Sequence, residues 1–85
     1  MARIIDGGRM NMVGGRVRQL RLERGMSQKM LSDRLETLAV YICRGSISRL
    51  EDMQRTVTDI ELHGLAKVLG VSIDELFRDE PGDRR

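Results

Sequence analysis

The segment Gly25-Met26-Ser27-Gln28 places a helix end directly before a helix start. Glycine adopts the left-handed conformation that ends many helices, so Gly25 can close a helix that precedes it. Ser27 can accept a hydrogen bond from the unpaired N–H groups of the next helix, and Met26 can pack against Leu31 across that cap. The segment therefore predicts two helices joined by a short turn, the second of which begins at Gln28.

Apolar residues at helical spacing set the extent of these two helices. Val13, Val17 and Leu20 lie four and three residues apart, which places them on one face of a helix over about residues 12–24. After the turn, a similar apolar stripe extends the second helix to about Val40. We expect core positions for the side chains of this stripe, which are Leu31, Leu35, Leu38 and Ile42.

Three further helices are predicted nearer the C-terminus. The first covers about residues 44–52, where apolar side chains alternate with short polar and basic ones. Each of the other two begins with a capping box, in which a Ser or Thr precedes a Glu by three residues and each side chain caps the other's backbone. The capping pairs are Thr58 with Glu61 and Ser72 with Glu75, and the two helices end at Gly70 and Phe77.

Composition restricts the core to aliphatic side chains. The chain has 85 residues, with one tyrosine, one phenylalanine and no tryptophan. The β-branched and aromatic runs typical of strands are scarce, and the length suffices for one small domain. We therefore expect a compact all-α domain of five helices over residues 12–77, with a flexible arm before it, 1–11, and a flexible tail after it, 78–85.

No segment indicates a membrane or an exported protein. No apolar run approaches the ~20 residues that span a bilayer, and the N-terminus lacks the apolar stretch of a signal peptide. The single cysteine, Cys43, forms no internal disulfide, which fits a reducing compartment. We expect a cytoplasmic protein in which Cys43 is a buried or half-buried apolar residue, with a redox switch as the alternative.

Charge is distributed unevenly along the chain. Residues 1–55 carry eleven Lys or Arg against six Asp or Glu, whereas residues 56–85 carry four against seven. A basic front half points to a polyanionic partner such as a nucleic acid. The alternative is the ordinary surface charge of a soluble helical protein.

Four fragments of the chain form one recurring pattern. They are QLR at 19–21, RGMSQ at 24–28, ISRLE at 47–51 and LAKVLGVSIDELF at 65–77. In this order and spacing they resemble the Cro/repressor-type, or xenobiotic-response-element type, helix-turn-helix family. The resemblance covers residues 13–77. It implies a lambda-repressor-like five-helix domain from a bacterium, an archaeon or a phage that binds operator DNA, usually as a homodimer.

The connection before the third helix departs from that family. Eleven residues, Glu36 to Ser46, separate Leu35 from Ile47, which is more than the family usually places there. The glycine of the family's tight turn is also missing. The chain therefore resembles a branch in which either the second helix or the connection after it is lengthened.

The resemblance also implies two groups of DNA-contacting residues. Gln28 matches a residue that contacts phosphate, and a helix N-terminus is by itself suited to an anion. The further phosphate candidates are Lys29, Arg55 and Thr56. The third helix would read bases in the major groove through Arg44, Gly45, Ser46, Ser48 and Arg49. The alternatives are that the arginines contact only phosphates and that the phosphate candidates are merely solvated.

Arg21 and Glu51 match two positions that form an ion pair in the resembling proteins. A bidentate pair between an arginine and a carboxylate would tie the first helix to the third. The alternative is two separate surface charges.

Together these features predict a sequence-specific regulator of transcription that binds double-stranded DNA, and more specifically a repressor that acts as a homodimer on a palindromic operator. The alternative is an antitoxin or another protein-interaction module that uses the acidic surface of the last two helices. Candidate dimer surfaces are the last helix with Phe77 and the connection with Tyr41.

No catalytic motif is present and His63 has no companion metal ligands, so we expect no enzyme, cofactor or metal.

Overall fold

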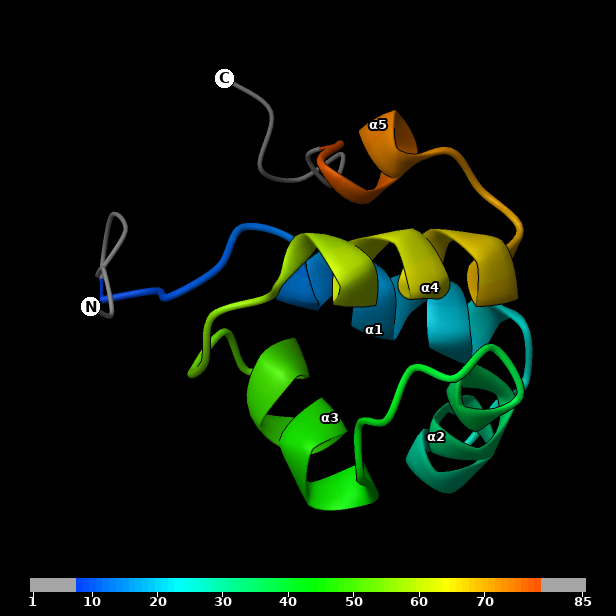
Figure 1. Ribbon diagram of the computed structural model, residues 1–85. Helices are drawn as coiled ribbons and strands as arrows, with labels where there is room; N and C mark the ends of the chain where they lie inside the picture. Colours follow the sequence, from blue (N-terminus) through cyan, green and yellow to red (C-terminus); the bar gives the residue numbers. More distant parts are fainter. Residues whose placement is uncertain (1–7, 79–85) are drawn as a thin grey trace.

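Five α-helices make up most of the described chain (Figure 1). The computed structural model describes residues 8–78, and within that range no strand occurs, so the predicted all-α fold is confirmed. None of its helices is both long and apolar enough to cross a bilayer. The helices are α1 (Gly14–Glu23), α2 (Gln28–Glu36), α3 (Arg44–Glu51), α4 (Asp59–Leu69) and α5 (Ile73–Leu76).

The core is aliphatic, as the composition requires. α1 and α4 lie across the middle of the molecule, α2 and α3 pack on one side of them, and α5 lies on the other side (Figure 1). All five helices contribute fully buried side chains, each of which stabilises the fold by about 1.5–3 kcal/mol through its removal from water. These side chains include Val17, Leu31, Leu35, Ile47, Leu50, Leu65, Leu69 and Leu76.

The turn between α1 and α2 has the geometry expected from its sequence. Gly25 adopts a φ of +68°, and Met26 is buried. The Ser27 hydroxyl accepts a hydrogen bond from the Met30 N–H at 3.0 Å, which caps α2. The predicted start of α2 at Gln28 is therefore confirmed.

α2 ends at Glu36, so the prediction that it continues to Val40 is wrong. The N–H groups of Ala39 and Val40 turn back to the carbonyls of Glu36 and Leu35, at 2.9 and 3.0 Å. Ala39 adopts a φ of +61°, which an α-helix does not allow. After this turn Val40 is buried in the core, next to Gly64 of α4.

The extra residues of this chain therefore form a connection, residues 37–43, rather than a longer helix. Leu38 is 42% exposed, so its predicted core position is also wrong. Val40 and Ile42 are buried in its place. The Ser32 hydroxyl of α2 donates to the Ile42 carbonyl at 2.6 Å, which fixes the connection just before α3.

α4 and α5 begin at the predicted caps. Thr58 Oγ1 accepts from the Glu61 N–H, and the Glu61 carboxylate accepts from the Thr58 N–H, both at 3.1 Å. Gly70 ends α4 with a φ of +72°. Ser72 likewise accepts from the Glu75 N–H at 3.2 Å, but the Glu75 carboxylate does not complete the second capping box.

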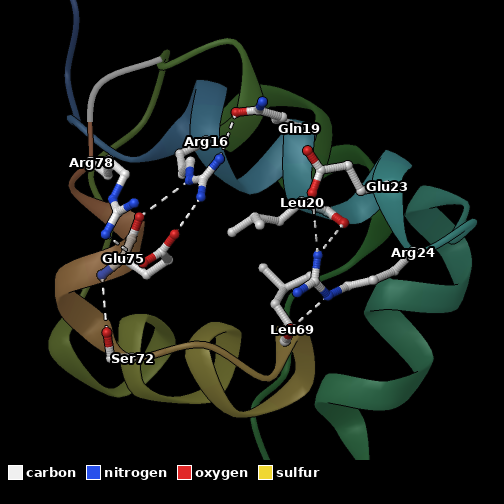
Figure 2. Close-up of polar contacts among 9 residues, drawn as sticks. All are labelled: Arg16, Gln19, Leu20, Glu23, Arg24, Leu69, Ser72, Glu75 and Arg78. Carbon is white, nitrogen blue, oxygen red and sulfur yellow. Dashed lines mark hydrogen bonds and ion pairs between the residues drawn. The ribbon is translucent and has the colours of Figure 1, made fainter. Parts of the chain in front are cut away.

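That carboxylate instead holds α5 to α1 (Figure 2). The Arg16 guanidinium donates to one Glu75 carboxylate oxygen at 2.6 Å and to the Glu75 carbonyl at 3.3 Å. Arg78 pairs with the other carboxylate oxygen at 3.2 Å. At the C-cap of α1, Arg24 donates to the Leu69 carbonyl at 2.7 Å, at the end of α4. Arg16 in α1 and Arg24 at its C-cap thus position both C-terminal helices.

Met10 and Asn11, predicted to lie in the arm, pack against the folded domain. The Met10 N–H donates to the Met53 carbonyl at 2.9 Å. The buried Asn11 side chain donates to the Leu50 carbonyl at 3.1 Å and accepts from the Gly14 N–H at 2.8 Å. The arm therefore ends before Met10, and α1 begins at Gly14 rather than at residue 12. The parts of the predicted arm and tail that lie outside the described residues are 1–7 and 79–85.

Candidate nucleic-acid interface

One side of α3 faces solvent at the edge of the molecule, away from α5 (Figure 1). Ile47, Leu50 and Glu51 face the interior. Because an α-helix repeats every 3.6 residues, the remaining residues share the outer side. This outer side carries all five predicted base contacts, of which Arg44, Gly45 and Arg49 are exposed and Ser46 and Ser48 are half-buried.

Arg44 has the least restricted side chain of this group. It is the first residue of α3 and is exposed, and its side chain forms no hydrogen bond or ion pair with another residue in the described part of the chain. Arg49, in contrast, donates to the Ser46 hydroxyl at 3.1 Å. No atom lies within 4 Å of the position that a Cβ would take on Gly45, so the first turn of α3 is open to a close partner.

A buried ion pair fixes α3 to α1. Arg21 donates from Nε and Nη2 to the two carboxylate oxygens of Glu51, at 2.6 and 3.0 Å. The third guanidinium nitrogen, Nη1, donates to the Met26 carbonyl at 2.7 Å, in the turn before α2. Both charged side chains are buried. The planar guanidinium suits this bidentate geometry and at the same time holds the turn in place.

Gln28 joins the start of α2 to the same ion pair. Its side-chain amide donates to Glu51 at 3.1 Å. The backbone N–H groups of Gln28 and Lys29 belong to the first turn of α2, where N–H groups have no partner within the helix and can meet an anion. The exposed Lys29 side chain contacts Asp33 at 3.3 Å. The first-turn backbone N–H groups of α2 are therefore the groups suited to an anion, and the Gln28 side chain supports Glu51.

Arg55 and Thr56, the other predicted phosphate contacts, lie apart from this arrangement. The half-buried Arg55 guanidinium pairs with the Glu61 carboxylate at 2.9 Å. Thr56 lines an apolar hollow together with Met12 and Phe77, beside α1 and α5. The structure does not bring these two residues together with the outer side of α3.

Cys43 is exposed, so the expectation of a buried or half-buried apolar residue is wrong. The preceding residue, Ile42, is buried in the core instead. Cys43 occupies the N-cap of α3, and its side chain forms no capping hydrogen bond. The N–H of Ser46 is the main influence on the Cys43 thiol and lowers its pKa, while desolvation opposes it. The N–H of Gly45, the charge of Arg49 and the Ser46 hydroxyl lower the pKa of the thiol further. At a given pH, a larger fraction of Cys43 is thus thiolate than for an ordinary cysteine, beside the predicted base contacts.

Sequence reasoning missed two residues that position α3. Asn11 holds the Leu50 carbonyl at the end of the helix. Gly14 lies so close to α3 that a Cβ there would overlap the Leu50 carbonyl oxygen and approach Met53 Cγ at 2.9 Å. The backbones of α1 and α3 therefore meet directly. The glycine pair at 14–15 is the sequence signal for such a close approach.

The pair α2–α3, whose second helix exposes a basic outer side, has the form of a helix-turn-helix unit. A family model described as Helix-turn-helix matches residues 17–76. The chain therefore belongs to the Cro/repressor-type helix-turn-helix family. Its membership makes it a DNA-binding regulator of transcription.

Among solved structures, the restriction-modification controller protein C.AhdI from Aeromonas hydrophila is similar to this chain. The two are 30% identical and superpose with a TM-score of 0.68, over 78% of this chain and 92% of C.AhdI. The comparison with curated proteins finds no match. The fold and the family thus rest on two independent comparisons, one by sequence model and one by structure.

Proposed function

We propose that the protein is a transcriptional repressor that binds a palindromic operator as a homodimer. Each protomer would place α3 in the major groove, and two copies of α3 about 34 Å apart would enter successive grooves on one face of the duplex. The observation that carries the proposal is Arg44, exposed at the N-terminus of α3 with no partner among the described residues.

Base contacts and phosphate contacts are assigned to different helices. An arginine can bind guanine O6 and N7 with two hydrogen bonds, so Arg44 is the main base-reading residue. Gln28 and Lys29 bind a phosphate at the N-terminus of α2 through their backbone N–H groups, and the Lys29 ammonium adds charge. The remaining base contacts are assigned to Gly45, Ser46, Ser48 and Arg49.

The likeness to C.AhdI favours a controller role over that of a phage repressor or an antitoxin. C.AhdI is described as a restriction-modification controller protein. We infer that this chain regulates genes in a similar setting, where the concentration of the protein sets the occupancy of its operator by mass action.

An apolar hollow beside α5 is suited to a second copy of the chain. It is lined by Met12, Val57, Leu62 and Phe77, among others, and Phe77 is exposed. Contiguous exposed apolar surface of this kind marks protein contacts. The hollow does not include the outer side of α3, so its occupation leaves that side open to DNA.

Selection of binding sites from random duplexes, followed by a salt titration, tests the proposal. We expect an inverted-repeat motif and a steep loss of affinity with salt, because each bound phosphate releases counterions. Arg44→Ala should relax the preference at one base position in each half-site, whereas Lys29→Ala should weaken all sequences alike.

Two outcomes would contradict this proposal. A uniform loss of affinity in both variants would show that Arg44 does not read bases. A tight protein partner combined with no affinity for any duplex would instead favour a protein-interaction module.

A further inference from the structure

Tyr41 has the most exposed large apolar side chain in the described part of the chain, at 75% of its surface. It lies in the connection 37–43, three residues before α3 begins at Arg44. A tyrosine side chain combines a large apolar ring with a polar hydroxyl at its tip. Such side chains are common at interfaces with partners that have both apolar and polar surface.

The connection around Tyr41 is held firmly although it is not helical. The neighbours on either side, Val40 and Ile42, are only 7% and 4% exposed. The Ile42 carbonyl accepts from the Ser32 hydroxyl at 2.6 Å. Two buried neighbours and this hydrogen bond fix the backbone, so Tyr41 is presented to solvent by a preformed loop. A contact made there costs little ordering of the chain.

Tyr41 shares a surface with the first turn of α3. It lines a hollow together with Cys43, the N-cap of α3, and Ser46, one of the residues assigned to base contact. The other lining residues come from α2 and the connection, and they are Ser32, Glu36 and Ile42. The Tyr41 side chain is therefore continuous with the surface assigned above to DNA.

We propose that Tyr41 contacts the sugar–phosphate backbone beside the groove that α3 enters, an inference that rests on the proposed DNA-binding function. The phenol hydroxyl donates to a phosphate oxygen, and the ring packs on a deoxyribose. Tyrosine is among the residues that make such backbone contacts in protein–DNA complexes. Glu36 lines the same hollow, and its carboxylate keeps a phosphate out of the hollow itself. The contact therefore lies at the rim, which the long side chain of Tyr41 reaches.

The test compares Tyr41→Ala and Tyr41→Phe with the wild-type chain on the selected duplex, by fluorescence anisotropy at several salt concentrations. Tyr41→Ala should weaken binding roughly threefold to tenfold. Tyr41→Phe should weaken binding by a smaller factor, because it removes only the hydrogen bond. The base preference and the slope of log Kd against log salt should not change, because tyrosine carries no charge. Leu22→Ala, which shortens an exposed apolar side chain of α1, is the matched control and should bind like the wild type.

The other outcomes each overturn the inference in a distinguishable way. Wild-type affinity in Tyr41→Ala, with reduced affinity in Arg44→Ala, removes Tyr41 from the interface and leaves the proposed function intact. A loss of binding that light scattering traces to dissociated protomers assigns Tyr41 to a dimer contact instead. A wild-type chain that selects no duplex overturns both proposals. Circular dichroism of each variant shows whether it is folded, so that a loss of binding caused by misfolding is recognised.

Discussion

Arg21, Glu51 and Gln28 form a charged cluster inside a small aliphatic core. Glu51 is only 4% exposed, and its carboxylate accepts from both other side chains. A buried charge is tolerated when it is paired and its remaining lone pairs are satisfied, which is the arrangement seen here. The cluster links α1, α2 and α3, so its role is to set the position of α3 relative to the N-terminus of α2.

Removing one charge of this cluster should destabilise the protein more than removing both. Arg21→Met should lower the free energy of unfolding by about 3–5 kcal/mol, because it strands Glu51 without its cation. The double variant Arg21→Met/Glu51→Leu should lose less, since no buried charge remains. Urea denaturation followed by circular dichroism measures both. Asp33→Ala, which removes an exposed partner of Lys29, is the control and should change the free energy of unfolding by no more than about 1 kcal/mol. A double variant less stable than the single one would contradict this account.

The Cys43 thiol should react at a lower pH in the folded protein than in the unfolded chain. Since the N–H of Ser46 lowers its pKa, a larger fraction is thiolate at any pH below the ordinary pKa of a cysteine. The rate of alkylation by iodoacetamide, measured against pH, should therefore reach its midpoint earlier in the native state. The same chain in urea is the control, because it holds a single cysteine. Coincident midpoints would show that the N-cap position has no effect on the thiol.

At the scale of elements, the connection between α2 and α3 is the part of the fold that apolar periodicity does not predict. It leaves α2 through a left-handed residue, Ala39, and it is fastened by the buried side chains of Val40 and Ile42. Left-handed backbone costs a non-glycine residue roughly 1–2 kcal/mol. Packing of Val40 beside Gly64 therefore outweighs a local strain.

Ala39→Gly should stabilise the protein. Glycine adopts a φ of +61° without steric cost, although its greater freedom in the unfolded chain offsets part of the gain. We expect an increase of about 0.5–1 kcal/mol in the free energy of unfolding, seen as a rise in Tm of a few degrees. The reverse change, Gly70→Ala at a φ of +72° with open space around it, should lower the stability by about 1 kcal/mol. A loss of stability in Ala39→Gly would mean that the methyl group makes a contact worth more than the strain.

The sequence predicts the capped helix starts correctly and the end of α2 wrongly, and the reason is physical. The caps at Ser27, Thr58 and Ser72 are local hydrogen bonds, and each appears where its residue type indicates. The end of α2 depends on a contact between Val40 and Gly64, which no local pattern contains. The apolar stripe that includes Leu38 continues past that end and so predicts too long a helix.

The site shows the same division between local and distant information. The outer side of α3 follows from its periodicity, so the residues near Arg44 are placed as predicted on one exposed face. The ion pair between Arg21 and Glu51 followed only from the family resemblance. The two residues lie thirty positions apart, so no local sequence pattern indicates that they are in contact. Asn11 was missed, since its role depends on the Leu50 carbonyl, which lies 39 residues farther along the sequence.

At the scale of the whole molecule, the two proposed interfaces lie on different parts of the surface. The outer side of α3 lies away from α5, with α1 and α4 between them (Figure 1). The apolar hollow, in contrast, is formed by residues before α1, after α3 and at Phe77. Ion pairs and hydrogen bonds from Arg16 and Arg24 hold the C-terminal helices to α1 (Figure 2), so the two surfaces belong to one connected framework.

Phe77→Asp should convert the proposed dimer to monomers. The carboxylate introduces a charge that burial in the interface would desolvate, and the exposed aromatic surface is lost. Static light scattering should show a fall from the dimer to the monomer mass, and affinity for the operator should fall with it. His63→Asp adds the same charge on an exposed position of α4 and should leave the mass unchanged. An intact Phe77→Asp dimer would exclude the α5 surface.

The contact at Gly14 has a consequence for how the operator is matched. Since α1 touches the end of α3 backbone to backbone, with Asn11 bridging them, α3 cannot swing or slide without opening the hydrophobic interior. In the proposed dimer, movement of α3 within each protomer therefore adds little freedom to the separation between the two inserted helices. A duplex whose half-sites are one base pair too far apart must itself twist or bend to fit, so the stiffness of the central, untouched base pairs becomes part of what the protein recognises.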